Sequence, residues 1–189
     1  MLAHNETNPW VVLDEQEVYQ NAWIKLHHYK VINPSGKEGI YGKVHFINKA
    51  IGIIPIDENL HTYLVGQYRF TLQQYSWEIP EGGCSGHETS LSAAKRELME
   101  ETGLQAAKWV YLGKAFLSNS VTDELAEFFV ATELSLFTAS PEETEQLQIK
   151  KVPLQQAFEM IENGTITDAV SVLALQKLQL MWMQGKWKP

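Results

Sequence analysis

Short alternations of apolar and polar residues follow one another from residue 10 to residue 67. They cover 24–32, 39–47, 50–56 and 61–67, and turn-forming clusters at 33–36 and 57–59 separate them. A period of two places successive side chains on opposite faces of a strand, whereas Asn, Pro, Gly and Asp favour turns. The pattern predicts strands joined as successive hairpins.

A helical period begins after a glycine-rich segment. Residues 80–86 read Pro-Glu-Gly-Gly-Cys-Ser-Gly, a composition that predicts a loop without regular structure. A helix is predicted over 89–102, and Gly103 follows it as a C-terminal cap. Its core-facing residues are expected to be Leu91, Ala94 and Leu98.

The second half of the chain predicts three further strands and two helices. The strands are expected at 115–117, 126–132 and 147–152. A helix is expected over 154–163, and Asp168 is placed to cap a last helix over 169–183. This order favours the α/β (α+β) class, a mixed sheet with helices packed on its faces.

Composition narrows the function classes. The chain has 189 residues, of which 44% are hydrophobic, enough for a real core. A single cysteine, the absence of a signal-like start and the absence of an apolar run near ~20 residues predict a cytoplasmic protein without membrane association. The net charge of -8 argues against nucleic acid as a partner, and a polyanionic substrate would need bound cations.

Three glutamates gather on one side of the helix predicted over 89–102. Glu97 and Glu101 are four residues apart and Glu100 follows Glu97 by three, so at ~100° per residue their carboxylates face the same way. Such charges repel unless solvent or cations screen them, and magnesium prefers carboxylate oxygens. Arg96 is placed to pair with Glu100. The residue types alone leave a solvated acidic face and a metal site open.

The spacing decides between these two interpretations. Gly82 is followed after five residues by Glu88, and after seven more by 96–104, Arg-Glu-Leu-Met-Glu-Glu-Thr-Gly-Leu. The chain thereby matches every fixed position of the Nudix box and resembles the Nudix hydrolases over 82–104. Nine specified positions co-occur by chance in well under about one in a million chains of this size.

The resemblance implies an α/β/α sandwich in which two or three magnesium ions, or manganese in their place, hold a substrate diphosphate. Glu97 and Glu101 match the family's principal metal ligands, and Glu100 matches an accessory ligand. The backbone carbonyl of Glu81 matches a further ligand. Structural roles in the box fall to Gly82, Gly103 and the pair Glu88 and Arg96.

Outside the box the chain resembles the ADP-ribose pyrophosphatase branch, through 65–69, 77–83 and 142–180. In that branch an arginine that matches Arg69 contacts the substrate, and an acidic residue that matches Glu124 lies near its ribose or phosphate. A structural salt bridge is the alternative role for Arg69. The segment 117–121, Leu-Ser-Asn-Ser-Val, departs from the Ser-Pro-Gly type segment of many such enzymes and leaves the substrate open.

The same branch carries its general base on a glutamate-rich loop that matches 142–145. The alignment puts Glu143 at the position of the base and Glu145 at a metal-facing position, where it is a ligand or the alternative base. A glutamate bound to metal has a depressed pKa and is a poor base, so a separate acid is needed. A solvated acidic loop is the plainer alternative.

The N-terminal residues 1–48 are rich in aromatic side chains and predict a β lobe, followed by a hydrolase domain over 49–189. The resemblance to the ADP-ribose pyrophosphatase branch, whose N-terminal strands commonly help form a homodimer, implies that this lobe is a dimerisation region. The resemblance implies cleavage of a nucleoside diphosphate sugar such as ADP-ribose to nucleoside monophosphate and sugar phosphate. GDP-mannose, NADH, a dinucleoside polyphosphate or an oxidised nucleotide stay open as substrates. A Nudix module that senses nucleotides without turnover is the alternative from another class.

Overall fold

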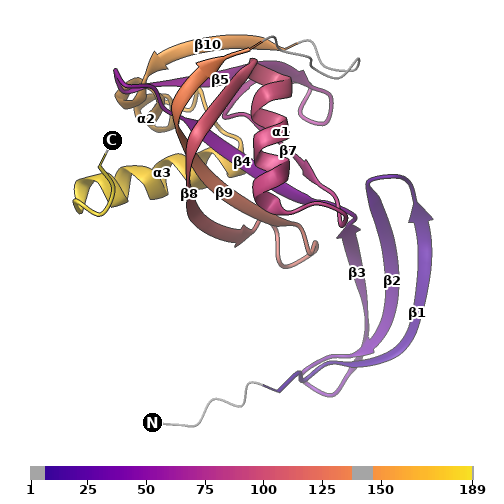
Figure 1. Cartoon of the computed structure of the whole chain (residues 1–189). Coiled ribbons are helices and arrows are strands. Elements are labelled where there is room, and N and C mark those ends of the chain that lie inside the picture. Colours follow the sequence, from indigo (N-terminus) through magenta and orange to yellow (C-terminus); the bar gives the residue numbers. More distant parts are fainter. Residues whose placement is uncertain (1–6, 138–146, 189) are drawn as a thin grey trace. The chain divides into compact units, whose positions relative to one another are not determined.

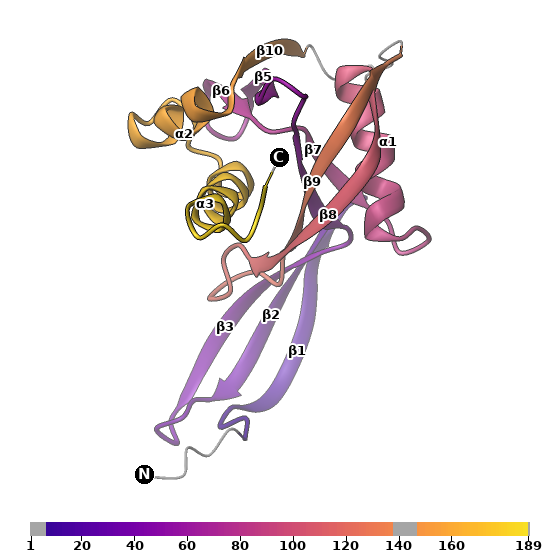
Figure 2. The same cartoon turned by 60° about the vertical axis from the view of Figure 1, so that its left-hand side comes forward.

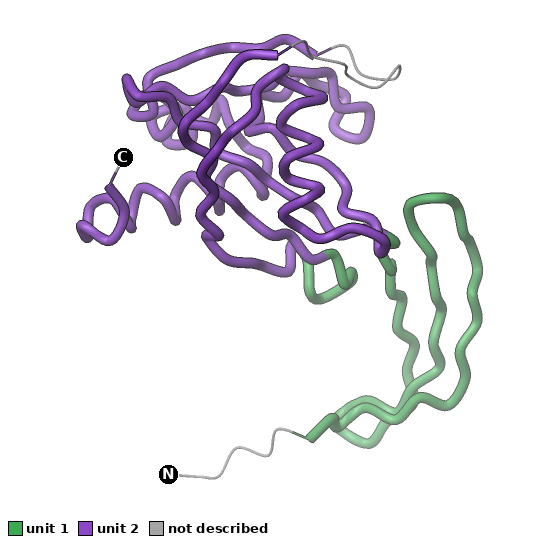
Figure 3. The backbone as a smooth tube through the Cα atoms, viewed as in Figure 1, with its two compact units in different colours: residues 1–47, 118–124 green, residues 48–117, 125–189 purple. Residues whose placement is uncertain are grey.

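The structure of the chain is a computed structural model that describes residues 7–137 and 147–188. The backbone forms two compact units (Figure 3). One comprises Met1–Ile47 and Ser118–Glu124, and the other comprises Asn48–Leu117 and Leu125–Pro189. The first unit therefore includes a segment that is distant in sequence and lies outside the predicted lobe of residues 1–48.

The first unit is an antiparallel three-stranded sheet in the order β1-β2-β3. Its strands are β1 (Val11–Gln20), β2 (Ile24–Ile32) and β3 (Glu38–Phe46). The side-chain oxygen of Asn33 accepts hydrogen bonds from two backbone N–H groups of the β2–β3 turn, as Asn does in many turns. Asp123 accepts a hydrogen bond from the backbone N–H of Phe46 at 3.0 Å, which ties the segment 118–124 to β3.

The second unit contains two sheets (Figure 1). The four-stranded sheet has the order β7-β4-β9-β8, and its strands are β4 (Lys49–Pro55), β7 (Glu81–Cys84), β8 (Leu104–Phe116) and β9 (Leu125–Leu136). Because β4 runs parallel to β9 and antiparallel to β7, this sheet is mixed. The three-stranded sheet has the order β10-β5-β6, and its strands are β5 (His61–Arg69), β6 (Gln74–Glu78) and β10 (Gln148–Pro153).

Helices cover both faces of the four-stranded sheet. Figure 2 shows α1 (Ser90–Thr102) on one face and α3 (Ala169–Met183) on the other, whereas α2 (Leu154–Glu162) packs against α3 and against β5 and β10 of the three-stranded sheet. In β4, Ile51 and Ile53 are buried with Leu98 of α1, whereas Ile54 is buried with Leu175 of α3. This alternation follows from the period of two along a strand. The mixed sheet between helices confirms the predicted α/β (α+β) class.

Local capping explains where the two helices that flank this sheet begin and end. The hydroxyl of Thr89 accepts a hydrogen bond from the backbone of Ser92 at 3.1 Å, and Gly103 ends α1 in the left-handed region with φ 67°. Asp168 caps α3 by accepting from the backbone N–H of Ser171 at 2.7 Å. In the part of the chain that the structure describes, no helix is long and apolar enough to cross a membrane.

One predicted loop is wrong, because Glu81–Cys84 forms strand β7. The backbone of β7 pairs with β4, and this pairing needs no side chains. Two consecutive glycines are therefore compatible with the strand. At Gly82 an added Cβ would overlap the carboxylate of Glu97, so the glycine leaves the space that this side chain occupies.

Other differences concern strand lengths and one core position. The predicted strand 115–117 is only the end of β8, which starts at Leu104, and β1 and β6 were not separately predicted. A bulge between Tyr111 and Gly113 interrupts the pairing of β8 with β9, so no single alternation runs along it. Leu91 was predicted to face the core, but it is 38% exposed and the small residue Ala93 is buried in its place.

Candidate active site

The N-terminal end of β7 lies against the glutamate-bearing side of α1. Glu97 fills the space beside Gly82. Glu101 is buried, and its Oε2 accepts a hydrogen bond from the backbone N–H of Glu81 at 2.9 Å. The structure thus brings together Glu81, Gly82, Glu97 and Glu101, which are up to twenty residues apart in sequence.

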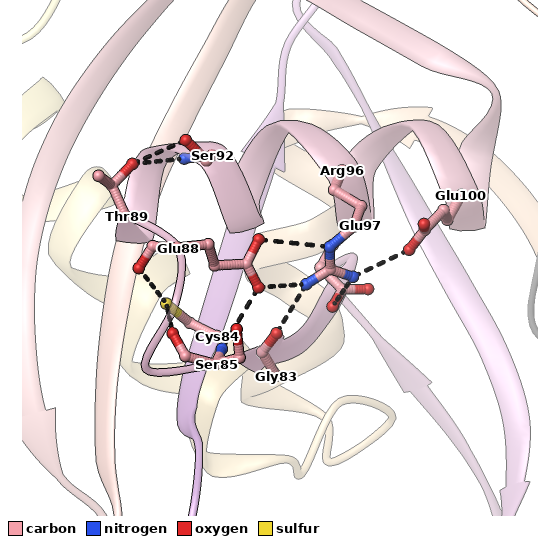
Figure 4. Close-up of polar contacts among 9 residues, drawn as sticks. All are labelled: Gly83, Cys84, Ser85, Glu88, Thr89, Ser92, Arg96, Glu97 and Glu100. Atoms are coloured by element: carbon pink, nitrogen blue, oxygen red, sulfur yellow. Dashed lines mark hydrogen bonds and ion pairs between the residues drawn. The ribbon is translucent and has the colours of Figure 1, made fainter.

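Arg96 organises the carboxylates along this side of α1 (Figure 4). Its Nη1 donates to Glu97 at 2.7 Å and to Glu100 at 2.9 Å. Its Nη2 donates to the backbone oxygen of Gly83 at 2.8 Å and to Glu88 at 2.9 Å, and its Nε donates to the second oxygen of Glu88 at 3.5 Å. A guanidinium has five N–H donors, so every donor of Arg96 is used.

The charges in this cluster shift two pKa values in the directions expected for ion pairs. The hydrogen bond from Arg96 lowers the pKa of Glu88 and outweighs partial burial, which raises it. Burial lowers the pKa of Arg96, but its hydrogen bonds to Glu88 and Glu97 outweigh burial and raise it. Arg96 stays charged and holds three carboxylates in place, which fits the structural roles predicted for Glu88 and Arg96.

A second arginine, Arg69 at the end of β5, bridges two other glutamates. Its Nε donates to both oxygens of Glu78, at 2.9 and 3.1 Å. Its Nη2 donates to Glu78 at 2.5 Å and to Oε1 of Glu81 at 2.8 Å. Glu78 is only 1% exposed, so its charge depends on this bidentate contact. Among the residues that the structure describes, Nη1 of Arg69 has no hydrogen-bond acceptor.

Asp168 adds a third carboxylate to this group. Oxygens of Glu78, Glu81 and Asp168 lie within 4.8 Å of one another, opposite one guanidinium. Burial, together with the charges of Asp168 and Glu78, raises the pKa of Glu81 well above its usual value, although Arg69 opposes this shift. The Oε2 atom of Glu81 is buried and has no hydrogen-bond partner in the described part of the chain.

Sequence reasoning missed the roles of Glu78 and Asp168 in this group. The sequence predicts Asp168 only as a helix cap, and it marks Glu78 only as part of the segment 77–83, which resembles the ADP-ribose pyrophosphatase branch. Their positions follow from the buried hydrogen bond between the backbone N–H of Ile79 and Oγ of Ser171, at 2.9 Å. This bond joins the end of β6 to the first turn of α3, and no local signal in the sequence indicates it.

Of the three other predicted site residues, Glu124, Glu143 and Glu145, the structure describes only Glu124. Glu124 is half-buried at the end of the segment 118–124, which belongs to the first unit, and its backbone N–H donates to Thr122 at 3.5 Å. Glu143 and Glu145 lie outside the described residues.

The donor set on β7 and α1 fits a hard divalent cation. It consists of carboxylates and backbone carbonyls, which are the oxygen ligands that magnesium takes in proteins. Glu97, Glu100 and Glu101 offer the carboxylates from one side of one helix. Nearby, Oε2 of Glu81 is a buried oxygen without a hydrogen-bond partner among the described residues, so the protein's own donors leave this acceptor unused.

Comparison with known proteins gives consistent matches over most of the chain. The family model of the NUDIX domain matches residues 47–175, and that of the nucleoside diphosphate sugar hydrolase N-terminal domain matches residues 10–44. An ADP-ribose pyrophosphatase of Bacillus subtilis (strain 168) is 29% identical over 168 residues, 88% of this chain and 90% of the relative.

Two further relatives extend the comparison. A GDP-mannose pyrophosphatase of Yersinia pestis (strain Pestoides F) is 24% identical over 193 residues, 92% of this chain and 93% of the relative. The crystal structure of an ADP compounds hydrolase superimposes with a TM-score of 0.85 and 22% identity, over 96% of this chain and 98% of that chain. The latter similarity establishes a shared fold.

Proposed function

Because the chain belongs to the Nudix family and is a pyrophosphatase of that family, we propose that it hydrolyses the diphosphate linkage of a nucleoside diphosphate sugar such as ADP-ribose. The products are a nucleoside monophosphate and a sugar phosphate. Nudix hydrolases generally use a divalent metal, and here we propose magnesium, with manganese as a substitute. The observation that carries this proposal is the group of carboxylates that Arg96 and Gly82 position on one side of α1.

We assign the metal ligands to the residues of this group. Glu97 and Glu101 hold the metal, with Glu100 as an accessory ligand and the backbone carbonyl of Glu81 as a further ligand. When bound, magnesium neutralises the diphosphate charge and lowers the pKa of a coordinated water. Arg69 is the substrate contact that we propose on the other side of Glu81.

The proton of the attacking water goes to a glutamate outside this group. The segment between β9 and β10 carries Glu143, the proposed general base, and Glu145, a further metal ligand or the alternative base. Carboxylates that hold a metal are poor bases because their lone pairs are engaged. In the first unit, Glu124 is proposed to lie near the ribose or phosphate of the substrate.

The relatives support a nucleotide sugar as the substrate and leave two candidate substrates, ADP-ribose and GDP-mannose. The Bacillus subtilis relative is an ADP-ribose pyrophosphatase, whereas the Yersinia pestis relative is a GDP-mannose pyrophosphatase. The match of residues 10–44 to a nucleoside diphosphate sugar hydrolase N-terminal domain favours a sugar nucleotide over a triphosphate or a dinucleoside polyphosphate. GDP-mannose is therefore the second candidate substrate.

A substrate panel tests this proposal. The purified chain is incubated with magnesium and ADP-ribose, GDP-mannose, NADH, diadenosine polyphosphates or nucleoside triphosphates, and the products are identified by mass. We expect the highest kcat/KM for ADP-ribose, with AMP and ribose 5-phosphate as products. A higher value for GDP-mannose would replace the proposed substrate, and turnover of every compound no faster than in buffer with magnesium would favour the nucleotide-sensing module.

We further propose that the chain forms a homodimer through its N-terminal strands. The edge strand β1 is exposed along its whole length, and Val11, Val12, Leu13 and Tyr19 are each more than half exposed. An edge strand with several exposed apolar side chains commonly pairs with another surface. Light scattering at micromolar concentration is expected to give twice the mass of the chain. A monomer mass would contradict the proposed homodimer but not the proposed hydrolase activity.

A further inference from the structure

The two arginines of the second unit use their hydrogen-bond donors differently. Arg96 donates with all three nitrogens to Glu88, Glu97, Glu100 and the backbone of Gly83. Arg69 donates only with Nε and Nη2, so in the described structure both N–H groups of Nη1 lack a protein acceptor. About a third of the side chain of Arg69 is exposed to solvent. Arg69 thus has one guanidinium edge that can still bind an oxygen anion.

Glu78 and Glu81 together determine the orientation of that edge. The bidentate contact with Glu78 sets the plane of the Arg69 guanidinium, since two parallel hydrogen bonds resist rotation. Glu81 accepts from the other side of Nη2, at 2.8 Å, and thereby prevents the guanidinium from pivoting about Glu78. The carboxylates of Glu78 and Glu81 thus hold the Nε and Nη2 side of the guanidinium and leave the Nη1 side open.

Glu81 also contacts the metal-binding side of α1. Its backbone N–H donates to Oε2 of Glu101 at 2.9 Å, while its side chain accepts from Arg69. One residue therefore connects the proposed substrate arginine to a proposed metal ligand. The connection is short and largely buried, because the side chain of Glu81 is only 13% exposed.

We infer that Glu81 is a positioning residue: its side chain orients Arg69 so that the open Nη1 edge binds the diphosphate of the substrate beside the carboxylates of α1. This inference rests on the proposed function, since it takes the substrate to be a nucleoside diphosphate. Glu81 acts through Arg69 and need not touch the substrate with its side chain.

Two substitutions of Glu81 separate its effect on the orientation of Arg69 from the effect of the size of its side chain. Glu81→Ala removes one of the two acceptors of Nη2 and leaves only Glu78, so Arg69 can pivot about Glu78 and kcat/KM with ADP-ribose falls about 10-fold, mainly through KM. Glu81→Gln keeps an acceptor oxygen at nearly the same place and retains most of kcat/KM. The matched control is Glu127→Ala, because Glu127 is equally buried, at 14% exposure, and pairs with Lys49 at 3.3 Å outside the two arginine clusters.

A double-mutant cycle with Arg69→Lys tests whether Glu81 acts through Arg69. Lysine keeps the charge but lacks the planar fork, so it cannot be oriented in the same way. In the Arg69→Lys background, Glu81→Ala is expected to change kcat/KM by less than about 2-fold. An equal loss in both backgrounds, or a loss in Glu127→Ala as large as in Glu81→Ala, would overturn the inference.

A second readout keeps this test independent of the substrate. Binding of inorganic pyrophosphate, measured by calorimetry without metal, is expected to weaken about 10-fold in Glu81→Ala and to follow the same cycle. If ADP-ribose is not hydrolysed but the pyrophosphate cycle holds, the proposed function fails and the inference stands. If ADP-ribose is hydrolysed equally by all variants and the pyrophosphate affinities agree, the inference fails and the proposed function stands.

Discussion

Two arginines of the second unit each lie near three carboxylates, yet the pKa of a glutamate shifts in opposite directions in the two clusters. Around Arg96, Glu97 and Glu100 lie on one side of α1 and Glu88 precedes the helix, and the pKa of Glu88 falls because the hydrogen bond from Arg96 dominates. Around Arg69, Glu78 is almost fully buried, and the pKa of Glu81 rises because burial and the charges of Asp168 and Glu78 outweigh the opposing charge of Arg69. One arginine and three carboxylates therefore give either an arginine whose five N–H donors are all used or an arginine whose Nη1 has no acceptor among the described residues.

The largest expected effect is on the Arg96 side, where the metal ligands are proposed. Glu101→Gln and Glu97→Gln each preserve size but delete a metal-binding charge, so we expect kcat to fall at least about 100-fold with the fold intact. Circular dichroism checks the fold, and steady-state kinetics at limiting magnesium checks turnover. Glu100→Gln is expected to lose less, because Glu100 is an accessory ligand. Near-parental activity of the Glu97 or Glu101 variant would show that the metal assignment is wrong.

The general base is expected to belong to neither arginine cluster. Glu143→Gln should lower kcat by about 100-fold with little change in magnesium or substrate affinity, because general-base catalysis contributes ~10²–10⁴-fold. Pre-steady-state turnover and substrate binding are measured for Glu143→Gln and Glu145→Gln together. Unchanged kcat in both variants would exclude this loop as the source of the base.

Substitution of the two arginines themselves tests the comparison directly. Arg96→Lys is expected to raise the magnesium concentration for half-maximal activity about 10-fold, because lysine cannot hold Glu97 and Glu100 with a planar fork. Arg69→Lys is expected to raise KM about 10-fold at saturating magnesium, since the open donor edge is lost. Kinetics over a grid of magnesium and substrate concentrations separates the two effects. If both variants changed only KM, or both changed only the magnesium requirement, Arg96 and Arg69 would not have the separate roles proposed for them.

The smallest expected effect comes from a carboxylate outside both clusters. Asp57 accepts hydrogen bonds from the backbone of Asn59 and His61 and pairs with Lys151 at 2.6 Å. Burial raises the pKa of Asp57, but these contacts outweigh it and lower the pKa below the usual value. Asp57→Asn is expected to lower the free energy of unfolding at pH 7 by about 2 kcal/mol and to leave kcat/KM unchanged.

The sign of this shift predicts a pH dependence. A lowered folded-state pKa stabilises the protein above the ordinary value, and this stability is lost as pH falls through the folded-state pKa. The difference between wild type and Asp57→Asn in urea unfolding should therefore be full at pH 7 and shrink below about pH 4. A difference that grows on acidification would contradict the assigned contacts.

Helix α1, which carries the proposed metal ligands, was predictable from sequence because its determinants are local. Although Thr89 is the N-cap of α1 and not its first residue as predicted, the cap at Gly103 and the spacing of Glu97, Glu100 and Glu101 act within four residues along one helix. The same holds for Asp168 as the cap of α3. The resemblance to the Nudix box rests on this local pattern, and the match of the family model to residues 47–175 confirms it.

The three helices, the caps at Gly103 and Asp168, most strands and the identity of the box residues could be predicted from the amino-acid sequence. Only contacts between distant segments show that Glu81–Cys84 pairs as a strand, that 118–124 belongs to the first unit, and that Arg69 meets Glu78 and Glu81. Asp168 reaches these two glutamates from the far end of the chain through the packing of α3. The physical reason is that the order of strands in a sheet and the burial of a side chain depend on contacts between distant segments, and burial in turn sets which charges are compensated.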